Sequence, residues 1–487
     1  MKTFKRIEGK KLVWFFLFAA FFLVLGLSCD LEPDPETGDG TFWALDLSAS
    51  GTVYYKIQAK LREEGEHCLV YEEIPGIGSN SQSIPYTQVL SLINEFDTKI
   101  YPKLTPVFGE PVDVSGSGKV TLLLMDIRDG FVNAETTPGY VAGYFSYVDI
   151  ENGPYSNHRD MLYIDTWPAT LSTPQGRAQI YGTIAHEFQH LINYSRHVGG
   201  NEMELWIDEG LAESAGYVYS GVLDQSRIKY YREDPKGSIQ YGNTFYVWYD
   251  GFDDVLAEYA TVYLFFQWLR IQADNGIDIY SEIISSDKTD YRAVLQAADD
   301  HLWIPDWENL LRYWFAANFF CDPDGLAGYG GKINENELNA RAYNAGAFAE
   351  HKVDLLPGEG VYSVLPSALT PPTGSGYGAN ICYAELDYAS LDVNDTPPFN
   401  TGGSGEVYLL TFNGNTKNAG LVQSDIETGY ITNVLPSPGS QRMLNIQAAQ
   451  SSRALVPEKI PEPWEWDGAR YFFDKCNPAP RGPARRR

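Results

Sequence analysis

Basic residues and cysteine are both scarce in this chain of 487 residues. Lysine and arginine together number 36 against 64 aspartates and glutamates, which gives a formal net charge of −28. A surface this acidic repels phosphate backbones and anionic lipid headgroups, so the composition argues against nucleic acid as a partner and against electrostatic docking on a membrane. The 5 cysteines contain no Cys-x-x-Cys pair, so neither a zinc ribbon nor a redox motif is indicated.

The N-terminal apolar run is too short for a typical membrane span. It covers residues 12–26, whereas a spanning helix needs ~20 residues, and it follows a cluster of basic residues, as signal peptides do. It leads into Leu25-Gly26-Leu27-Ser28-Cys29, which resembles a bacterial lipobox. The resemblance implies that residues 1–28 are removed and that Cys29 is lipidated. The alternative is an uncleaved membrane anchor with an incidental cysteine.

Residues 29–41 are rich in Pro, Gly and Asp, which predicts a flexible tether. We therefore expect a lipid-anchored protein of the bacterial cell envelope, held at the outer membrane, the cell surface or the periplasmic face. The remaining cysteines are expected to form disulfides, with a pairing that the sequence leaves open, or to be buried thiols. They are Cys68, Cys321, Cys382 and Cys476.

Apolar periodicity predicts a mixed α/β part, then helices, then strands. Strands are predicted within 42–75 and at 119–127 and 161–166, and a helix at 86–100 is expected to end at Pro102 and Pro106. Helical patterns cover 176–197, 204–220, 256–273, 279–299 and 306–319. Beyond about residue 356, short strand-like runs alternate with turns, which indicates a small all-β domain. Residues 476–487 are predicted to be a disordered basic tail.

The helix predicted at 176–197 contains His186-Glu187-Phe188-Gln189-His190. Side chains four residues apart share a helix face, so both imidazoles can reach one metal ion. Glu187 lies ~100° around the helix from His186, where it can reach a metal-activated water without binding the metal itself. A catalytic zinc usually has three protein ligands, so this motif needs a third.

Eighteen residues separate His190 from Glu209, which stands in the run Trp206-Ile207-Asp208-Glu209-Gly210-Leu211-Ala212. This H-E-x-x-H-x18-E pattern resembles the gluzincin metallopeptidases. The layout over about residues 85–270 is similar to the hyicolysin-type endopeptidases, through the F-x-x-x-I-Y-P lead-in at 96–102, the strand at 119–127, the AGYF segment at 142–145 and the H-E-F-Q-H helix. The resemblance implies a zinc-dependent peptidase with His186, His190 and Glu209 as ligands and Glu187 as general base.

The same resemblance implies an α+β, zincin-like fold. A mixed sheet and the active-site helix would come first, followed by a helical subdomain and a small C-terminal all-β domain. We therefore predict the α/β part of a peptidase domain at 42–175, its helical part with the zinc site at 176–355, and the β domain at 356–475.

The resemblance to gluzincins also implies two further residues at the catalytic site, a carboxylate that orients a ligand histidine and a donor to the oxyanion. In gluzincins of the thermolysin kind an acid four residues after the third ligand, usually aspartate, orients a ligand histidine; here Glu213 either has this role or is a solvated carboxylate. Residues 258–269 resemble the helix that supplies a hydrogen-bond donor to the oxyanion in such enzymes. This resemblance implies Tyr259 as the donor, with Tyr263 and Tyr246 as the next candidates. A tyrosine in such an aromatic helix can equally be a core residue. The strand at 161–166 is either the sheet edge along which a peptide pairs or an interior strand.

Other readings of the sequence are less favoured. Asp113-Val114-Ser115-Gly116-Ser117-Gly118 has a faint similarity to a calcium loop, but Leu124 stands where a glutamate ligand belongs, so calcium is a weak expectation. A metzincin would need glycine and histidine at Asn193 and Arg196. The chain lacks the G-x-M-E-N segment of aminopeptidase N relatives, which favours cleavage within protein or peptide substrates. A zinc aminopeptidase and a catalytically silent surface-anchored binding protein or adhesin remain the alternatives.

Overall fold

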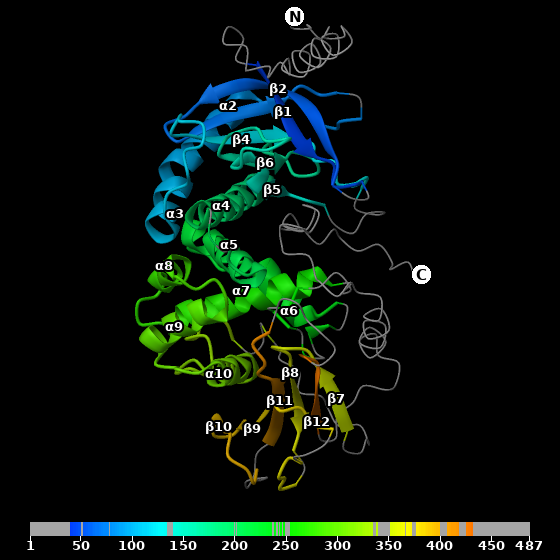
Figure 1. Cartoon of the computed structure of the whole chain (residues 1–487), viewed down its shortest axis with the longest axis vertical. Coiled ribbons are helices and arrows are strands. Elements are labelled where there is room, and N and C mark those ends of the chain that lie inside the picture. The colour runs from blue at the N-terminus through cyan, green and yellow to red at the C-terminus, as the bar shows by residue number, and fades with distance from the viewer. Residues whose placement is uncertain are drawn as a thin grey trace, which may run out of the picture.

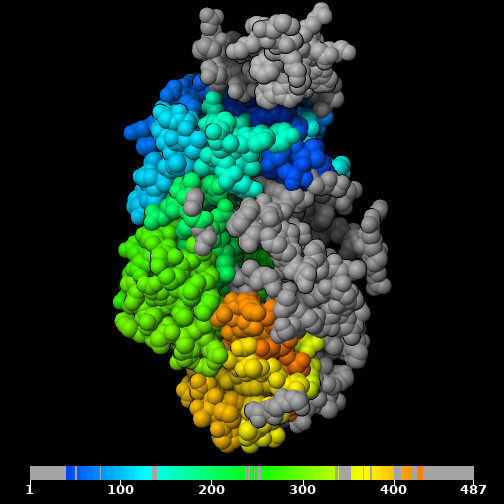
Figure 2. Space-filling view, in the orientation of Figure 1, coloured from blue at the N-terminus to red at the C-terminus, as the bar shows by residue number. Residues whose placement is uncertain are grey.

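The computed structural model describes residues 39–431 apart from 50–51, 77, 134–139, 199, 201, 236–237, 240–241, 243, 246, 249–253, 335–337, 339–350, 366, 373–375, 400–406 and 418–424. The predicted signal peptide, Cys29 and the basic tail lie outside the described residues. The described part forms three successive regions along the long axis of the molecule: a sheet, a group of helices and a smaller β region (Figures 1 and 2).

The first region is a six-stranded mixed sheet in the order β1-β2-β3-β4-β6-β5. Its strands are β1 (Asp39–Leu45), β2 (Tyr54–Glu64), β3 (Cys68–Glu73), β4 (Val120–Met125), β5 (Gly143–Phe145) and β6 (Met161–Asp165). Strands β3, β4 and β6 are parallel, and β5 pairs antiparallel with β6. Both faces of β4 and β6 are buried, which explains their continuous apolar runs.

The edge of the sheet beside β6 is β5. Of the two alternatives for 161–166, the structure shows the interior strand, because β6 lies between β4 and β5. Strand β5 has only three residues, so its sequence shows no usable alternation of polar and apolar side chains.

A long helical segment covers one face of this sheet. Helix α2 (Tyr86–Glu95) passes through a π-helical turn, η1 (Phe96–Ile100), into α3 (Tyr101–Phe108). The prediction that the helix ends at Pro102 is wrong, because Pro102 stands in the first turn of α3, where no helical hydrogen bond from its nitrogen is required. Pro106 lies inside the last turn, and the helix ends two residues later.

Helix α4 (Pro174–His197) lies between the sheet and the helical region (Figure 1). It begins where the Thr173 hydroxyl accepts a hydrogen bond from the Gly176 N–H at 3.0 Å, with Pro174 in the first turn. Its apolar face is fully buried, and the ring of Phe188 packs 5.4 Å from that of Phe96. The opposite side of α4 packs against α5.

The helical region follows as α5 (Leu205–Ser220), α6 (Gln225–Glu233), α7 (Val255–Gln272), α8 (Asp278–Ser285), α9 (Tyr291–Leu302) and α10 (Trp307–Phe320). The helix predicted at 279–299 is two helices, because the Asp290 side chain caps α9 by accepting from the Arg292 N–H at 3.0 Å. Helix α6 was not predicted. In the described part of the chain, no helix combines the length and the apolar character that crossing a bilayer requires.

The third region is all β. Strands β8 (Gly360–Val364), β9 (Ile381–Asp387), β10 (Asp392–Asn394) and β11 (Val407–Asn413) form one antiparallel sheet, and β7 (His351–Leu355) pairs with β12 (Glu427–Ile431). The ring of Phe412 packs 5.6 Å from that of Phe315 on α10. The predicted fold class, a mixed sheet, helices and a separate β region, is confirmed, whereas the exact domain boundaries stay predictions. Of the described cysteines, Cys68 and Cys321 are buried and Cys382 is half-buried, and Cys68 and Cys382 are free thiols.

Candidate metal centre

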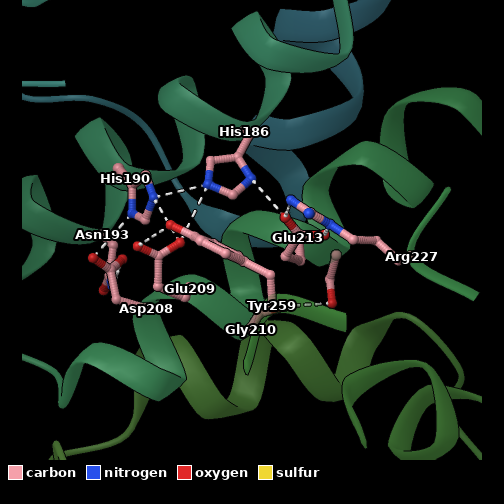
Figure 3. Close-up of polar contacts among 10 residues, drawn as sticks. His186, His190, Asn193, Asp208, Glu209, Gly210, Glu213, Arg227 and Tyr259 are labelled. Carbon is pink, nitrogen blue, oxygen red and sulfur yellow. Dashed lines mark hydrogen bonds and ion pairs between the residues drawn. The ribbon is translucent and has the colours of Figure 1, made fainter. Parts of the chain in front are cut away.

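Two imidazoles from one helix and a carboxylate from the next meet at a single point. His186 and His190 lie one turn apart on α4, with their Nε2 atoms 3.0 Å from each other. Oε2 of Glu209 on α5 lies 3.4 Å from Nε2 of His186 and 3.5 Å from Nε2 of His190. The three side chains point toward one another (Figure 3), and all three are buried. The structure thus brings together the three residues that the sequence analysis named as ligands.

The spacing of these three atoms suits a tetrahedral zinc ion. Zinc bound at ~2.0–2.1 Å with tetrahedral angles would hold its ligand atoms about 3.3 Å apart. The observed separations of 3.0, 3.4 and 3.5 Å bracket that value. Among the described residues, this is the one group of histidine, cysteine and acidic side chains close enough to hold a metal ion. Asp113, at the start of the weak calcium motif, is not part of such a group.

Asp208 holds the second histidine in place. Its Oδ2 lies 2.9 Å from Nδ1 of His190, and its Oδ1 accepts a hydrogen bond from the amide of Asn193. Burial alone would lower the pKa of His190, but the carboxylates of Asp208 and Glu209 raise that pKa well above its ordinary value. The centre therefore favours a positive charge at this position, which a bound cation would supply.

Glu213 stands behind the first histidine. Its Oε1 lies 3.7 Å from Nδ1 of His186, and the carboxylate is buried rather than solvated. Arg227 of α6 donates from Nη2 to Oε1 at 2.7 Å and from Nε to Oε2 at 3.0 Å. This two-point contact fixes the carboxylate beside the imidazole.

Tyr259 of α7 completes the group on the other side of Glu209. Its hydroxyl donates to Oε1 of Glu209 at 3.2 Å, and the guanidinium of Arg227 lies 4.8 Å from its ring centroid (Figure 3). Tyr263 is engaged elsewhere, since its hydroxyl accepts from the Asp224 N–H at 2.7 Å. The third tyrosine considered, Tyr246, lies outside the described residues.

Glu187 is fully buried where α4 meets the edge strand β5. A Cβ added at Gly143 of β5 would lie 3.3 Å from Cγ of Glu187 and 2.6 Å from Cγ2 of Thr183. Helix and strand therefore approach so closely at this point that only glycine fits without a shift. The glutamate of the motif lies directly beside the sheet edge as a result.

Sequence reasoning missed two residues of this centre, Asp208 and Arg227. Asp208 immediately precedes Glu209, so its sequence position alone does not show that it also faces α4. Arg227 belongs to helix α6, which was not predicted. The sequence signal for this helix was the capping residue Asp224, whose side chain accepts a hydrogen bond from the Ser226 N–H at 2.8 Å.

No family model matches the chain. The chain is similar to the neutral metalloprotease ShpI of Staphylococcus hyicus, with 36% identity over 221 residues. The matched stretch is 44% of this chain and 49% of ShpI, so the chain spans about half the length of this curated relative. The mixed sheet, the helices and the separate β region are consistent with a metalloprotease fold. Together with the His-His-Glu group, which fits a zinc site, this similarity supports a metallopeptidase.

Proposed function

We propose that the protein is a zinc-dependent endopeptidase that hydrolyses peptide bonds in extracellular or periplasmic proteins. The observation that carries this proposal is the convergence of His186, His190 and Glu209 on one point, with Glu187 following His186 in the same helix. Zinc held by these three side chains would act as a Lewis acid on the scissile carbonyl and lower the pKa of the attacking water.

The general base in this proposal is Glu187. It takes the proton from the attacking water and passes it to the leaving amine when the carbon–nitrogen bond breaks. Its position between α4 and β5 supports this role, because a peptide that pairs with the free side of the edge strand would run past the carboxylate. An extended substrate lying along an edge strand also suits cleavage inside a chain.

Tyr259 is the proposed donor to the oxyanion that develops in the transition state. It is supported by its place at the centre, where its hydroxyl donates to Oε1 of Glu209 at 3.2 Å. In the same proposal, Asp208 positions the imidazole of His190 by accepting from its Nδ1 at 2.9 Å, and Glu213, whose Oε1 lies 3.7 Å from Nδ1 of His186, orients that imidazole by charge attraction.

The cellular location is part of the proposal and depends on residues outside the described range. The lipobox-like sequence ending in Cys29 supports lipidation there and attachment to the bacterial cell envelope, with the catalytic part in an aqueous exported compartment. Radiolabelled fatty acid should be incorporated into the expressed protein and not into its Cys29→Ser variant.

The proposed reaction is tested with Glu187→Gln, which keeps the size of the side chain and removes the base. We expect the variant to bind one zinc ion per chain like the wild type and to lose about 10²–10⁴-fold in kcat on a protein substrate. Glu110→Gln is the matched control, since Glu110 lies on the surface beside Tyr101. Wild-type turnover by the Glu187 variant would exclude it as the base.

The same assay distinguishes the other possible functions. A peptide with a blocked N-terminus should be cut as well as its free-amine counterpart, whereas an aminopeptidase would spare the blocked peptide. Absence of chelator-sensitive cleavage by the zinc-loaded wild type would favour a catalytically silent binding protein.

A further inference from the structure

A pocket opens directly beside the metal centre. It lies between the β5 end of the sheet and the C-terminal half of α4, and His190 forms part of its wall. Its other lining residues include Phe145, Tyr147, Asn193, Tyr194 and Glu202. Because His190 belongs to both the pocket and the proposed zinc site, an occupant of the pocket would lie within one side-chain length of the reacting bond.

Aromatic rings form much of the pocket wall. The ring centroid of Tyr194 lies 5.8 Å from those of Phe145 and Tyr147. Such rings pack well against methylene groups, and their faces also attract cations. An occupant with an apolar stem and a positive end would match both properties.

The polar groups of the pocket are mainly hydrogen-bond acceptors. Asn193 is 4% exposed, and its amide nitrogen donates to Asp208, whereas its Oδ1 has no hydrogen-bond partner among the residues that the structure describes. Glu202 adds a carboxylate to the lining, and Glu151 accepts from the Tyr194 hydroxyl at 2.9 Å close by. Among the described residues that line the pocket there is no lysine or arginine, and the other basic side chain beside His190 is His197. Burial, then Glu151 and Glu202, raise the pKa of Tyr147, which agrees with a locally negative field.

We propose that this pocket binds a lysine or arginine side chain of the substrate, next to the bond that is cut. The inference rests on the proposed peptidase function and adds its substrate class. The alkyl stem would pack against Tyr147 and Tyr194, and the cationic end would donate to Asn193 Oδ1 and Glu202. An acidic side chain would be repelled by Glu202, and an apolar one would leave the buried oxygen of Asn193 unpaired.

The test compares peptides that differ at one position. Arginine, citrulline, norleucine or glutamate is placed in turn at each of three positions on either side of the cleaved bond. Citrulline keeps the shape of arginine without its charge. At the position that enters the pocket, we expect kcat/KM for arginine to exceed that for citrulline by about tenfold or more, as expected for a hydrogen bond to a charged group.

Two variants link the preference to the pocket. Glu202→Gln should reduce the advantage of arginine over citrulline about tenfold and should also reduce the advantage of arginine over norleucine. Glu66→Gln removes the same charge from an exposed residue between β2 and β3 and should change neither value. Equal rates for arginine and citrulline at every position, or a preference that Glu202→Gln leaves intact, would overturn the proposal.

A binding experiment separates this proposal from the proposed function. The Glu187→Gln protein, loaded with zinc, is titrated calorimetrically with N-acetyl-arginine amide and with N-acetyl-norleucine amide. Stronger binding of the arginine compound, lost when Glu202→Gln is added, supports the pocket even if the wild type cleaves no peptide. Equal binding of the two compounds contradicts the pocket even if the wild type is an active peptidase.

Discussion

At the scale of single residues, each proposed histidine ligand has a carboxylate behind it. Asp208 stands at Nδ1 of His190 and Glu213 at Nδ1 of His186, so both imidazoles direct Nε2 toward Glu209. A carboxylate in this position fixes the tautomer of the ring and raises its basicity toward a metal. Among the described residues, an arginine contacts Glu213 but not Asp208, and that difference allows the contribution of one carboxylate to be tested.

Arg227→Gln should weaken zinc binding by about 10–100-fold, because Glu213 loses the two-point contact that holds it beside His186. Arg227→Lys keeps the charge and should recover part of the affinity. Competition with a chromophoric chelator measures both values. The control is Arg232→Gln in the same helix, where the arginine makes only a half-exposed contact of 3.9 Å with Glu233. Unchanged affinity in Arg227→Gln would show that Glu213 keeps its place without the arginine.

The sequence identified those residues of the centre that local spacing determines. His186 and His190 are one helical turn apart, and Glu209 follows in a recognisable run, so all three were found. Arg227 comes to the centre only because α6 packs against α7, and no regular spacing connects it to the histidine motif. Contacts that depend on the crossing of two helices have no signature in a single sequence.

At the scale of elements, the position of Glu209 depends on how closely α5 approaches α7. Gly210 follows Glu209 on α5, and a Cβ added there would lie 2.2 Å from Cε2 of Phe266, a fully buried ring on α7. The ring cannot move aside without disturbing the core around Trp206, whose ring centroid lies 6.1 Å away. Glycine thus permits the helix contact that places the third proposed ligand.

Gly210→Ala should destabilise the protein by about 1–3 kcal/mol, since an extra methyl group in a filled core forces the two helices apart. Thermal denaturation in the presence of a chelator measures this effect without any contribution from metal. Displacement of α5 should also weaken zinc binding. Gly216→Ala is the control in the same helix, where the residue is half-buried and alanine favours the helix. A Gly210→Ala protein as stable as the wild type would mean that Phe266 can rearrange without cost.

Elements with strong periodicity were predicted well, and the errors have local causes. The buried strands β4 and β6 and the long helices α4, α5, α7 and α10 all lie close to their predicted positions. The edge strand β5 was missed because it is short, and Pro102 was misjudged because it follows the π-helical turn η1, in the first turn of α3, where a proline is accommodated. Which strand lies at an edge is a property of the whole sheet.

At the scale of the whole molecule, the candidate metal centre lies where two regions meet. His186 and His190 belong to α4, which packs on β5 and β6, whereas Glu209 belongs to α5, which packs on α7 in the helical region. An ion bound by all three side chains would therefore join the sheet to the helices. Without a metal ion, the described side chains beside the buried carboxylates of Asp208, Glu209 and Glu213 supply positive charge through Arg227 and a protonated His190, and zinc would add the charge of a divalent ion.

Zinc should therefore stabilise the fold as well as supply the proposed chemistry. An ion that binds only the folded protein adds about 4 kcal/mol when its free concentration is a thousand times its dissociation constant, which should raise the unfolding temperature by several degrees. Calorimetry with zinc and with a chelator measures the shift. Glu209→Gln should lose most of it, because one ligand charge is gone, whereas Glu233→Gln on the exposed surface of α6 should retain it. If zinc stabilises the Glu209 variant as much as the wild type, the ion does not bridge α4 and α5, and the joining of the two regions rests on side-chain packing alone.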